Sequence, residues 1–265
     1  MKISIVGCGW LGLPLGEKLA KSGHQVFGST TSVEKIATIK AAGITPFLMK
    51  LDPMPVGENF HQLFQTDLLI INIPPGRKTN TPEFYEEQIK HLRYLIDQHQ
   101  VAKVIFISST SFYPNTNALV NEQFLPDIEN GSNRAVVNAE QQITQSSVDI
   151  TILRCGGLMG DSRIPGKWFA GKETTSKDTP VNYIHRDDVI GVIEFLILNK
   201  AGQTTLNVVC PFHPSRKEVQ EAMAKKHNFE MPLWVEPNTS ESKIVDSSKL
   251  QKLGYDFLYD SPLKF

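Results

Sequence analysis

The chain has 265 residues, with 27 Lys and Arg against 28 Asp and Glu, so its formal net charge at pH 7 is −1. This balance argues against nucleic acid or an anionic membrane as the main partner, and no apolar stretch is long enough to cross a bilayer. The 3 cysteines are too few and too widely spaced for a disulfide framework or a zinc site, so we expect no metal and reduced thiols in a cytoplasmic protein.

Apolar runs alternate with amphipathic stretches through the first half of the chain, which predicts alternating strands and helices. In chain order these elements are a strand over 1–6, a helix over 11–21, a strand over 24–27, a helix from Thr31 (in capping-box spacing with Glu34) to about Ala42, strands over 47–51 and 67–73, a helix from Thr81, a strand over 104–108, a long irregular stretch over 109–133, a helix over 134–145 and a strand over 150–154.

The second half is less regular. We expect a loop over 156–180, a helix over 187–199, a strand over 205–209, a helix opened by Ser215 and Glu218, and a short helix over 246–253. The alternation as a whole predicts an α/β fold, with a Rossmann-type doubly wound parallel sheet and right-handed crossovers.

A glycine pattern follows the first predicted strand. Gly7, Gly9 and Gly12 form G-x-G-x-x-G around Trp10 and Leu11, between a strand and a helix. In this context the three glycines allow a tight turn, close approach of a pyrophosphate and close helix–strand packing. The pattern therefore predicts a dinucleotide-binding loop; the alternative is a purely structural turn. Residues 1–155 are expected to form this NAD(P)-binding portion, and residues 156–265 to complete the sheet and form a small substrate-binding lobe within one continuous unit.

The end of the second strand bears on which dinucleotide binds. NAD-binding proteins usually place Asp or Glu there, about 20 residues after the turn, to hold the ribose 2′-OH. This chain has Ser29, Thr30 and Thr31 instead, with Lys35 close by. Small hydroxyls and a lysine favour NADP, with NAD as the alternative. Thr31 has a second interpretation, as a helix cap only.

Two further strand ends carry candidate binding residues. Asp52 follows the third strand, where it is expected to meet the adenine amino group. Asn72, Ile73 and Pro74 lie at the carboxyl end of the fourth strand, which is where open α/β sheets bind their ligands.

Four later segments, together with the glycine turn, carry a family resemblance. They are ISSTSFYP (107–114), LRCGGLMG (153–160), NYIHRDD (182–188) and KLQKLGY (249–255). In this order the chain resembles the extended short-chain dehydrogenase/reductases, the NAD-dependent epimerase/dehydratase family. The resemblance implies NADP or NAD as cofactor, a small-molecule substrate with a hydroxyl or carbonyl group, such as a nucleotide sugar, and a homodimer formed through two central helices.

The resemblance also implies roles for individual residues. Ser109 matches the serine or threonine that hydrogen-bonds the substrate hydroxyl, with Thr110 as the alternative; both hydroxyls are also suited to satisfying local backbone groups. Tyr113 matches a family tyrosine other than the catalytic one. His185 and Asp187 match a loop anchor and a helix cap.

The chain departs from the family at the catalytic Tyr-x-x-x-Lys pair. Arg134 stands at the tyrosine position and Asn138 at the lysine position. Guanidinium is effectively always protonated, so Arg134 is a poor general base. It is suited to an anionic substrate group or a cofactor phosphate, or it is a surface arginine near Glu129 or Glu140. Tyr113 and Tyr183 are the alternatives for moving the proton.

Three functions remain open from the sequence. The first is an NAD(P)-dependent oxidoreductase or epimerase/dehydratase-like enzyme in which Ser109 holds the reacting oxygen. The second is a catalytically silent NAD(P)-binding sensor or regulator, which the missing pair favours. The third is a structural relic that binds no dinucleotide.

Overall fold

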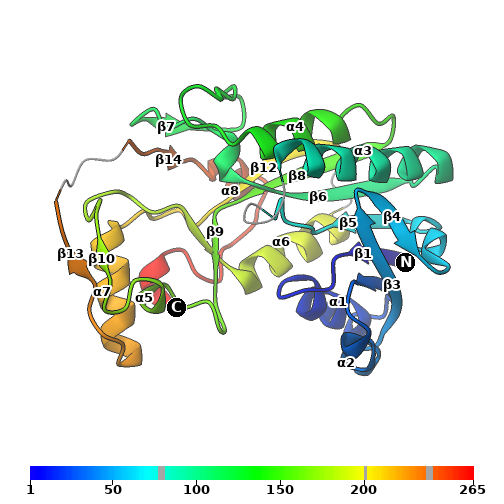
Figure 1. Cartoon of the computed structure of the whole chain (residues 1–265), viewed down its shortest axis with the longest axis horizontal. Helices are drawn as coiled ribbons and strands as arrows, with labels where there is room; N and C mark the ends of the chain where they lie inside the picture. Colours follow the sequence, from blue (N-terminus) through cyan, green and yellow to red (C-terminus); the bar gives the residue numbers. More distant parts are fainter. Residues whose placement is uncertain (77–80, 200–201, 237–240) are drawn as a thin grey trace. The chain divides into compact units, whose positions relative to one another are not determined.

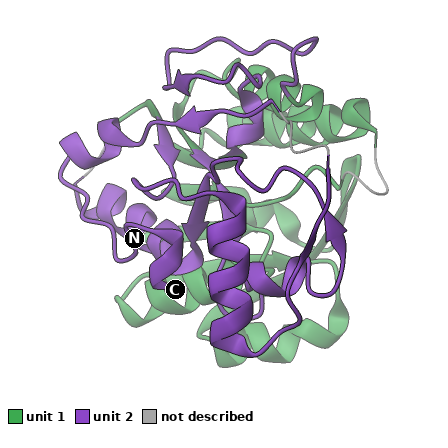
Figure 2. Cartoon of the chain, turned by 90° about the vertical axis from the view of Figure 1, so that its left-hand side faces the viewer, with its two compact units in different colours: residues 1–108, 133–153, 200–205 green, residues 109–132, 154–199, 206–265 purple. Residues whose placement is uncertain are grey.

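A computed structural model describes residues 1–76, 81–199, 202–236 and 241–265 (Figure 1). The chain divides into two compact units, which Figure 2 shows in different colours. Unit 1 comprises Met1–Ser108, Asn133–Leu153 and Lys200–Thr205, and unit 2 comprises Ser109–Ser132, Arg154–Asn199 and Leu206–Phe265.

The central feature is an eight-stranded sheet in the order β12-β8-β6-β5-β1-β2-β3-β4. Its strands are β1 (Lys2–Val6), β2 (Gln25–Thr30), β3 (Ile44–Asp52), β4 (Met54–Gly57), β5 (Leu68–Ile71), β6 (Lys103–Ser109), β8 (Asp149–Cys155) and β12 (Thr204–Val208). The pairs from β6 through β3 are parallel, and β3 turns back into the antiparallel β4. The α/β class and the Rossmann-type parallel sheet are therefore confirmed.

Helices connect the parallel strands of unit 1. They are α1 (Gly12–Lys21), η1 (Val33–Lys35), α2 (Ile36–Ala41), η2 (Phe60–Phe64), α3 (Pro82–His99) and α4 (Arg134–Ile143). The Thr81 hydroxyl accepts the N–H of Phe84 and so caps α3, and the Asn133 side chain caps α4 in the same way. Helices α3 and α4 run side by side in Figure 1.

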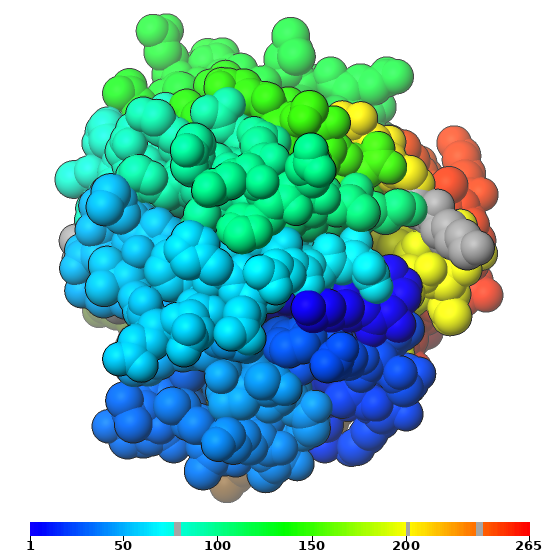
Figure 3. Space-filling view, turned by 90° about the vertical axis from the view of Figure 1, so that its right-hand side faces the viewer, coloured from blue at the N-terminus to red at the C-terminus, as the bar shows by residue number. Residues whose placement is uncertain are grey.

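Apolar residues fill both faces of this sheet. On the α1 face, Gly16 lies against Ile5 and Ile44. The other face belongs to a large core cluster in which Val6, Phe106 and Ile89 of α3 are almost wholly buried. Figure 3 shows one side of unit 1, where the blue surface of the first elements adjoins the cyan surface of the later ones.

Unit 2 contains short strands and four helices among its described residues. Its elements are η3 (Thr110–Phe112), β7 (Leu119–Val120), β9 (Gly157–Met159), α5 (Pro165–Trp168), β10 (Glu173–Thr174), β11 (Tyr183–His185), α6 (Arg186–Leu198), α7 (Arg216–His227), β13 (Leu233–Trp234), β14 (Ile244–Val245), α8 (Ser248–Lys252) and η4 (Pro262–Lys264). Three two-stranded parallel pairs form: β9 with β11, β10 with β13, and β7 with β14. The capping box of Ser215 and Glu218 at the start of α7 is confirmed.

Several local expectations are wrong, among them the second strand, which spans Gln25–Thr30 rather than 24–27 and so includes Ser29 and Thr30. Thr31 and Glu34 form no capping box, because Ser32 is the N-cap residue of η1 and its hydroxyl donates to Glu34 instead. The third strand spans Ile44–Asp52 rather than 47–51, because its pairing with β2 and β4 holds a longer segment extended. The expected loop over 156–180 contains β9, α5 and β10, whose short segments gain their order from tertiary partners.

No described helix is both long and apolar enough to cross a membrane, and the described residues hold no group of three or more His, Cys, Asp or Glu side chains suited to a metal ion.

Candidate functional site

The glycine turn between β1 and α1 has two glycines that the backbone requires. Gly7 has φ +104°, and a Cβ there would lie 2.4 Å from the carbonyl oxygen of Asn72. A Cβ on Gly12 would lie 2.2 Å from the carbonyl oxygen of Gly7. No side chain fits at such distances, so these two glycines allow the turn and the close approach of α1.

Gly9 differs from both. Among the described residues, no atom lies within 4 Å of the position that its Cβ would take. The fold therefore does not explain why this residue has no side chain. The space beside Gly9, next to the first turn of α1, suits a group that must approach the backbone closely.

Three hydrogen bonds hold the turn to the neighbouring strands. The Gly7 N–H donates to the Ser29 hydroxyl at 2.9 Å, and the Cys8 N–H donates to the Ser29 carbonyl oxygen at 2.8 Å. The Asn72 side-chain amide donates to the Gly7 carbonyl oxygen at 3.1 Å. Ser29 and Asn72, both expected to bind the cofactor, therefore also fix the shape of the turn.

A cavity of about 620 Å³ opens within unit 1 over this turn. It is lined by Val6, Gly7, Cys8, Gly9, Ser29, Thr30, Thr31, Lys35, Met49, Lys50, Leu51, Asp52, Asn72, Ile73, Pro74, Phe84 and Gln88. The structure thus brings together nine of the twelve residues expected at the cofactor. Trp10, Leu11 and Gly12 are not among the lining residues: Leu11 is buried and Gly12 packs against Gly7.

Charged groups of both signs line the cavity. Lys35 lies on η1, just after β2, and Lys50 and Asp52 lie on β3. The Lys50 ammonium forms an ion pair with the Asp52 carboxylate. Among the lining residues within the described ranges, Asp52 is the only carboxylate.

Sequence reasoning missed several lining residues. Lys50 stands two residues before Asp52, and the period of a strand places both on one face, so this signal was available. Phe84 and Gln88 come from α3, and only tertiary contact reveals them: the Gln88 side-chain amide donates to the Leu51 carbonyl oxygen at 2.8 Å.

The segment that follows β6 carries the residues expected at the substrate. The Ser109 hydroxyl accepts the N–H of Ser111 at 3.2 Å, which caps η3, and Thr110 is buried. Tyr113 is completely buried; its hydroxyl donates to Asn207 at 2.7 Å and accepts from Arg154 at 2.9 Å. Burial raises the pKa of Tyr113. A buried hydroxyl with two hydrogen-bond partners has a structural role. The expected role of Tyr113 in proton transfer stays a prediction.

A lysine that the motif analysis did not single out lies against this segment. Lys243 precedes β14, and its ammonium donates to the Tyr113 carbonyl oxygen. The Asn182 side chain donates to the Lys243 carbonyl oxygen at 2.8 Å and accepts the Val245 N–H at 2.9 Å. Burial lowers the pKa of Lys243 to about 8. Shifted pKa values are enriched at functional sites, and structural contacts produce them as well.

In unit 1, the positions of the family's catalytic pair lie at the start of α4. Arg134 is exposed. The pKa of Glu83 is lowered chiefly by hydrogen bonds from its own backbone and from the Thr81 side chain, and to a smaller extent by the charge of Arg134. The Asn138 side chain donates to Glu86 at 2.7 Å. The carboxylate of Glu140 is not on the surface with Arg134: it is buried and accepts from the Ser108 hydroxyl at 2.5 Å.

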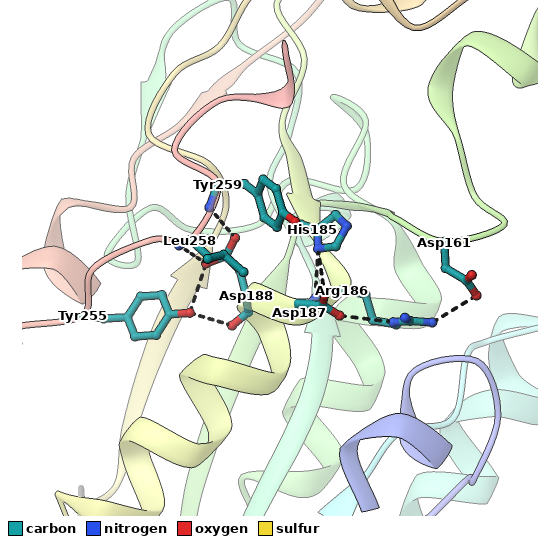
Figure 4. A network of polar contacts seen from close by, with 8 residues as sticks. All are labelled: Asp161, His185, Arg186, Asp187, Asp188, Tyr255, Leu258 and Tyr259. Atoms are coloured by element: carbon teal, nitrogen blue, oxygen red, sulfur yellow. Dashed lines mark hydrogen bonds and ion pairs between the residues drawn. The ribbon is translucent and has the colours of Figure 1, made fainter. Parts of the chain in front are cut away.

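The segment at the start of α6 has a structural role (Figure 4). His185, rather than Asp187, caps the helix: its Nδ1 accepts the Asp187 N–H at 3.2 Å. Burial lowers the pKa of His185, which favours the neutral ring that this acceptor role requires. Asp188 is wholly buried and accepts from the Tyr255 hydroxyl and from the N–H groups of Leu258 and Tyr259 at 2.7–3.0 Å, so it anchors the C-terminal segment.

A glycine turn under a cavity at the carboxyl ends of parallel strands defines a dinucleotide-binding protein of the Rossmann class. A family model described as NAD(P)H-binding matches residues 7–199, and the chain belongs to this family.

The chain is also similar over nearly its whole length to a curated relative and to solved structures. Protein YeeZ of Escherichia coli (strain K12) is 33% identical over 269 residues, covering 99% of this chain and 97% of that protein. The UDP-Glc/GlcNAc 4-epimerase of Campylobacter jejuni superposes with a TM-score of 0.79 at 21% identity, over 99% of this chain and 96% of that one. The Bordetella bronchiseptica enzyme WbmG in complex with NAD superposes with a TM-score of 0.77 at 16% identity, over 99% of this chain and 90% of that one. The fold is that of the NAD-dependent epimerase/dehydratases.

Proposed function

We propose that this protein is an NADP(H)-dependent enzyme, an oxidoreductase or an epimerase/dehydratase, that acts on a hydroxyl or carbonyl group of a small molecule resembling a nucleotide sugar. The observation that carries the proposal is the open space beside Gly9 at the floor of the cavity. Two glycines of the turn serve the backbone, and the third leaves room for a diphosphate at the amino end of α1.

In this proposal the chain's own residues bind and orient the dinucleotide. Backbone N–H groups of the turn contact the diphosphate, and the hydroxyls of Thr30 and Thr31 lie toward the adenosine ribose. Asn72, Ile73 and Pro74 line the end of the cavity at β5. The bound nicotinamide supplies hydride chemistry.

The proposed substrate roles follow the expectations drawn from the sequence. Ser109, or Thr110 in its place, holds the reacting oxygen, and Arg134 binds an anionic group of the substrate or cofactor. Tyr113 and Tyr183 are the proposed proton carriers. What supports a nucleotide sugar is the likeness to the UDP-Glc/GlcNAc 4-epimerase, and what supports the cofactor is the family and the complex of WbmG with NAD. The lack of a carboxylate directly after β2 favours NADP(H) over NAD(H).

Binding of NADPH to a Gly9→Ala variant tests the cofactor site. The added methyl group meets no protein atom within the described residues, so the fold is expected to survive while NADPH binding weakens by at least about tenfold. Gly202→Ala is the matched control, because its Cβ also meets no described atom within 4 Å and Gly202 does not line the cavity. Equal NADPH affinity in Gly9→Ala and Gly202→Ala contradicts the proposal.

Turnover tests the chemical step. The protein is incubated with NADP+ or NADPH and a panel of UDP-sugars, and the products are separated by ion-pair chromatography. We expect Ser109→Ala to lower kcat by about 10²-fold or more while leaving NADPH affinity unchanged. Unchanged turnover in Ser109→Ala removes this residue from the mechanism.

A catalytically silent sensor is the second candidate, and the start of α4 favours it. Asn138 is bound to Glu86, and Arg134 beside Glu83 is no general base. A sensor binds NADPH tightly, shows no turnover on the panel, and gains thermal stability with NADPH. A protein without any NADPH-induced rise in Tm is instead the structural relic.

The proposal also includes a homodimer and a cytoplasmic location. We place the homodimer contact on α3 and α4, where Tyr94 is 66% exposed on α3. Tyr94→Glu is expected to convert a dimer to a monomer in light scattering. All three cysteines are free and buried, which is compatible with the reducing cytoplasm.

A further inference from the structure

The end of β3 reaches beyond its neighbour β2 in the cavity wall. Leu48 pairs with Thr30, the last residue of β2, and residues 49–52 continue past that point. This overhang is held rigidly, because it pairs with β4 on one side and its Leu51 carbonyl accepts from Gln88 of α3. It lies next to the strand end at which Rossmann proteins recognise the adenosine ribose.

Two side chains of the overhang point to the same face of the strand. Lys50 and Asp52 are two residues apart, line the cavity and form an ion pair, with side chains 63% and 50% exposed. An exposed pair of this kind contributes about 0–1 kcal/mol, so a dianion readily replaces Asp52 as the partner of Lys50. Lys35, from η1, adds a second positive charge to the lining.

We propose that Lys50 is the residue that selects a 2′-phosphorylated dinucleotide, with Asp52 holding its ammonium in the cavity until the phosphate arrives. This inference rests on the proposed function and names the group that recognises the cofactor's 2′-phosphate. It also changes the role of Asp52: its carboxylate positions Lys50 rather than binding the adenine amino group.

The charges of the lining agree with this assignment. Lys35, Lys50 and Asp52 sum to one positive charge, whereas a 2′-phosphate carries close to two negative charges at neutral pH. Hydrogen bonds between an ammonium and a phosphate are about twice as strong as neutral ones. The 2′-OH of NADH needs an acceptor instead, and the Asp52 carboxylate, the one carboxylate among the described lining residues, already has one oxygen paired with Lys50.

The experiment measures Kd for NADPH and NADH by quenching of protein fluorescence, for wild type, Lys50→Met, Asp52→Asn and Lys40→Met. Lys40 is an exposed lysine of α2 outside the cavity lining and serves as the matched control. We expect the wild type to bind NADPH more tightly than NADH. Lys50→Met is expected to raise the Kd for NADPH about tenfold and to leave that for NADH within twofold. Asp52→Asn is expected to bind both dinucleotides. Lys40→Met is expected to change neither the Kd for NADPH nor that for NADH.

A pH series gives a second measurement. The 2′-phosphate gains a proton near pH 6, so the preference of the wild type for NADPH should shrink below that pH, and Lys50→Met should lose this dependence. Adenosine 2′-monophosphate should displace NADPH from the wild type at lower concentration than from Lys50→Met.

Several outcomes overturn the inference. The first is a wild type that binds NADH more tightly than NADPH. The second is a Lys50→Met variant whose affinities for the two dinucleotides equal those of the wild type or fall by the same factor. The third is an Asp52→Asn variant that binds neither dinucleotide. If the wild type binds a dinucleotide and Lys50→Met changes neither the Kd for NADPH nor that for NADH, only this inference fails. If the wild type binds neither NADPH nor NADH, the proposed function itself fails.

Discussion

The hydroxyl of Ser29, at the end of β2, accepts a hydrogen bond from the backbone N–H of Gly7 at 2.9 Å. The bond joins the glycine turn to the neighbouring strand, so one side chain both lines the cavity and sets the position of its floor. A single hydroxyl thereby links the end of β2 to the glycine turn.

Replacing Ser29 with Ala should therefore weaken binding as well as stability. The Gly7 N–H loses its acceptor, which is expected to lower the free energy of unfolding by about 1–3 kcal/mol and to raise the Kd for NADPH several-fold. Urea unfolding and NADPH titration measure the two effects. Thr38→Ala, which alters an exposed hydroxyl on α2, is the control for both. A Ser29→Ala protein as stable as Thr38→Ala would show that the bond contributes nothing.

Gly12→Ala should behave unlike Gly9→Ala. The new methyl group would meet the Gly7 carbonyl oxygen at 2.2 Å, so α1 must move away from the turn. Overpacking of this kind is expected to cost about 1–3 kcal/mol of stability, visible as a lower Tm without any ligand. Calorimetry of the two alanine variants side by side tests this difference. Equal Tm values would mean that the turn adapts without strain.

Lys243 should react with amine reagents at a lower pH than ordinary lysines. Burial lowers its pKa to about 8, so its neutral form is well populated at that pH. Labelling with an acylating reagent across pH 6–11, read by peptide mass spectrometry, is expected to give a midpoint near 8 for Lys243. The exposed Lys252 of α8 is the reference. A common midpoint for both lysines would contradict the expected burial effect.

The same lysine should shape stability at alkaline pH. Between about pH 8 and 10.5 the folded protein loses the Lys243 proton while the unfolded chain keeps it. The unfolded state then binds more protons, so this group makes the free energy of unfolding rise with pH across that window. Lys243→Met should lack this contribution when denaturant midpoints are compared at pH 7.5 and 10. A parallel pH dependence in both proteins would assign the change to other groups.

Tyr255→Phe should loosen the C-terminal segment. The hydroxyl donates to buried Asp188 at 3.0 Å, and its removal leaves that carboxylate with the N–H groups of Leu258 and Tyr259 (Figure 4). We expect a loss of about 1–3 kcal/mol and faster hydrogen exchange over 255–259. Tyr94→Phe, which removes an exposed hydroxyl on α3, is the control. Unchanged exchange in Tyr255→Phe would mean that the two N–H groups suffice to anchor the segment.

The sequence predicted best those features that depend on residues close together in the chain. The glycine turn, the helix opened at Thr81 and the capping box at Ser215 depend on residues within a few positions of one another, and the structure contains all three. The helix cap predicted at Thr31 is wrong because η1 begins at Val33 with Ser32 in the N-cap position, and only the path of the chain after β2 decides where η1 begins.

The sequence by itself determined the α/β class, the dinucleotide turn and most of the residues around it, because strand period, glycine freedom and capping act over short stretches of chain. Tertiary structure alone decided which glycine of the turn faces open space, that β3 extends past β2, and that Lys243 contacts Tyr113, 130 positions away in the chain. These depend on packing and desolvation between distant segments, and such contacts leave no periodic signal in the chain.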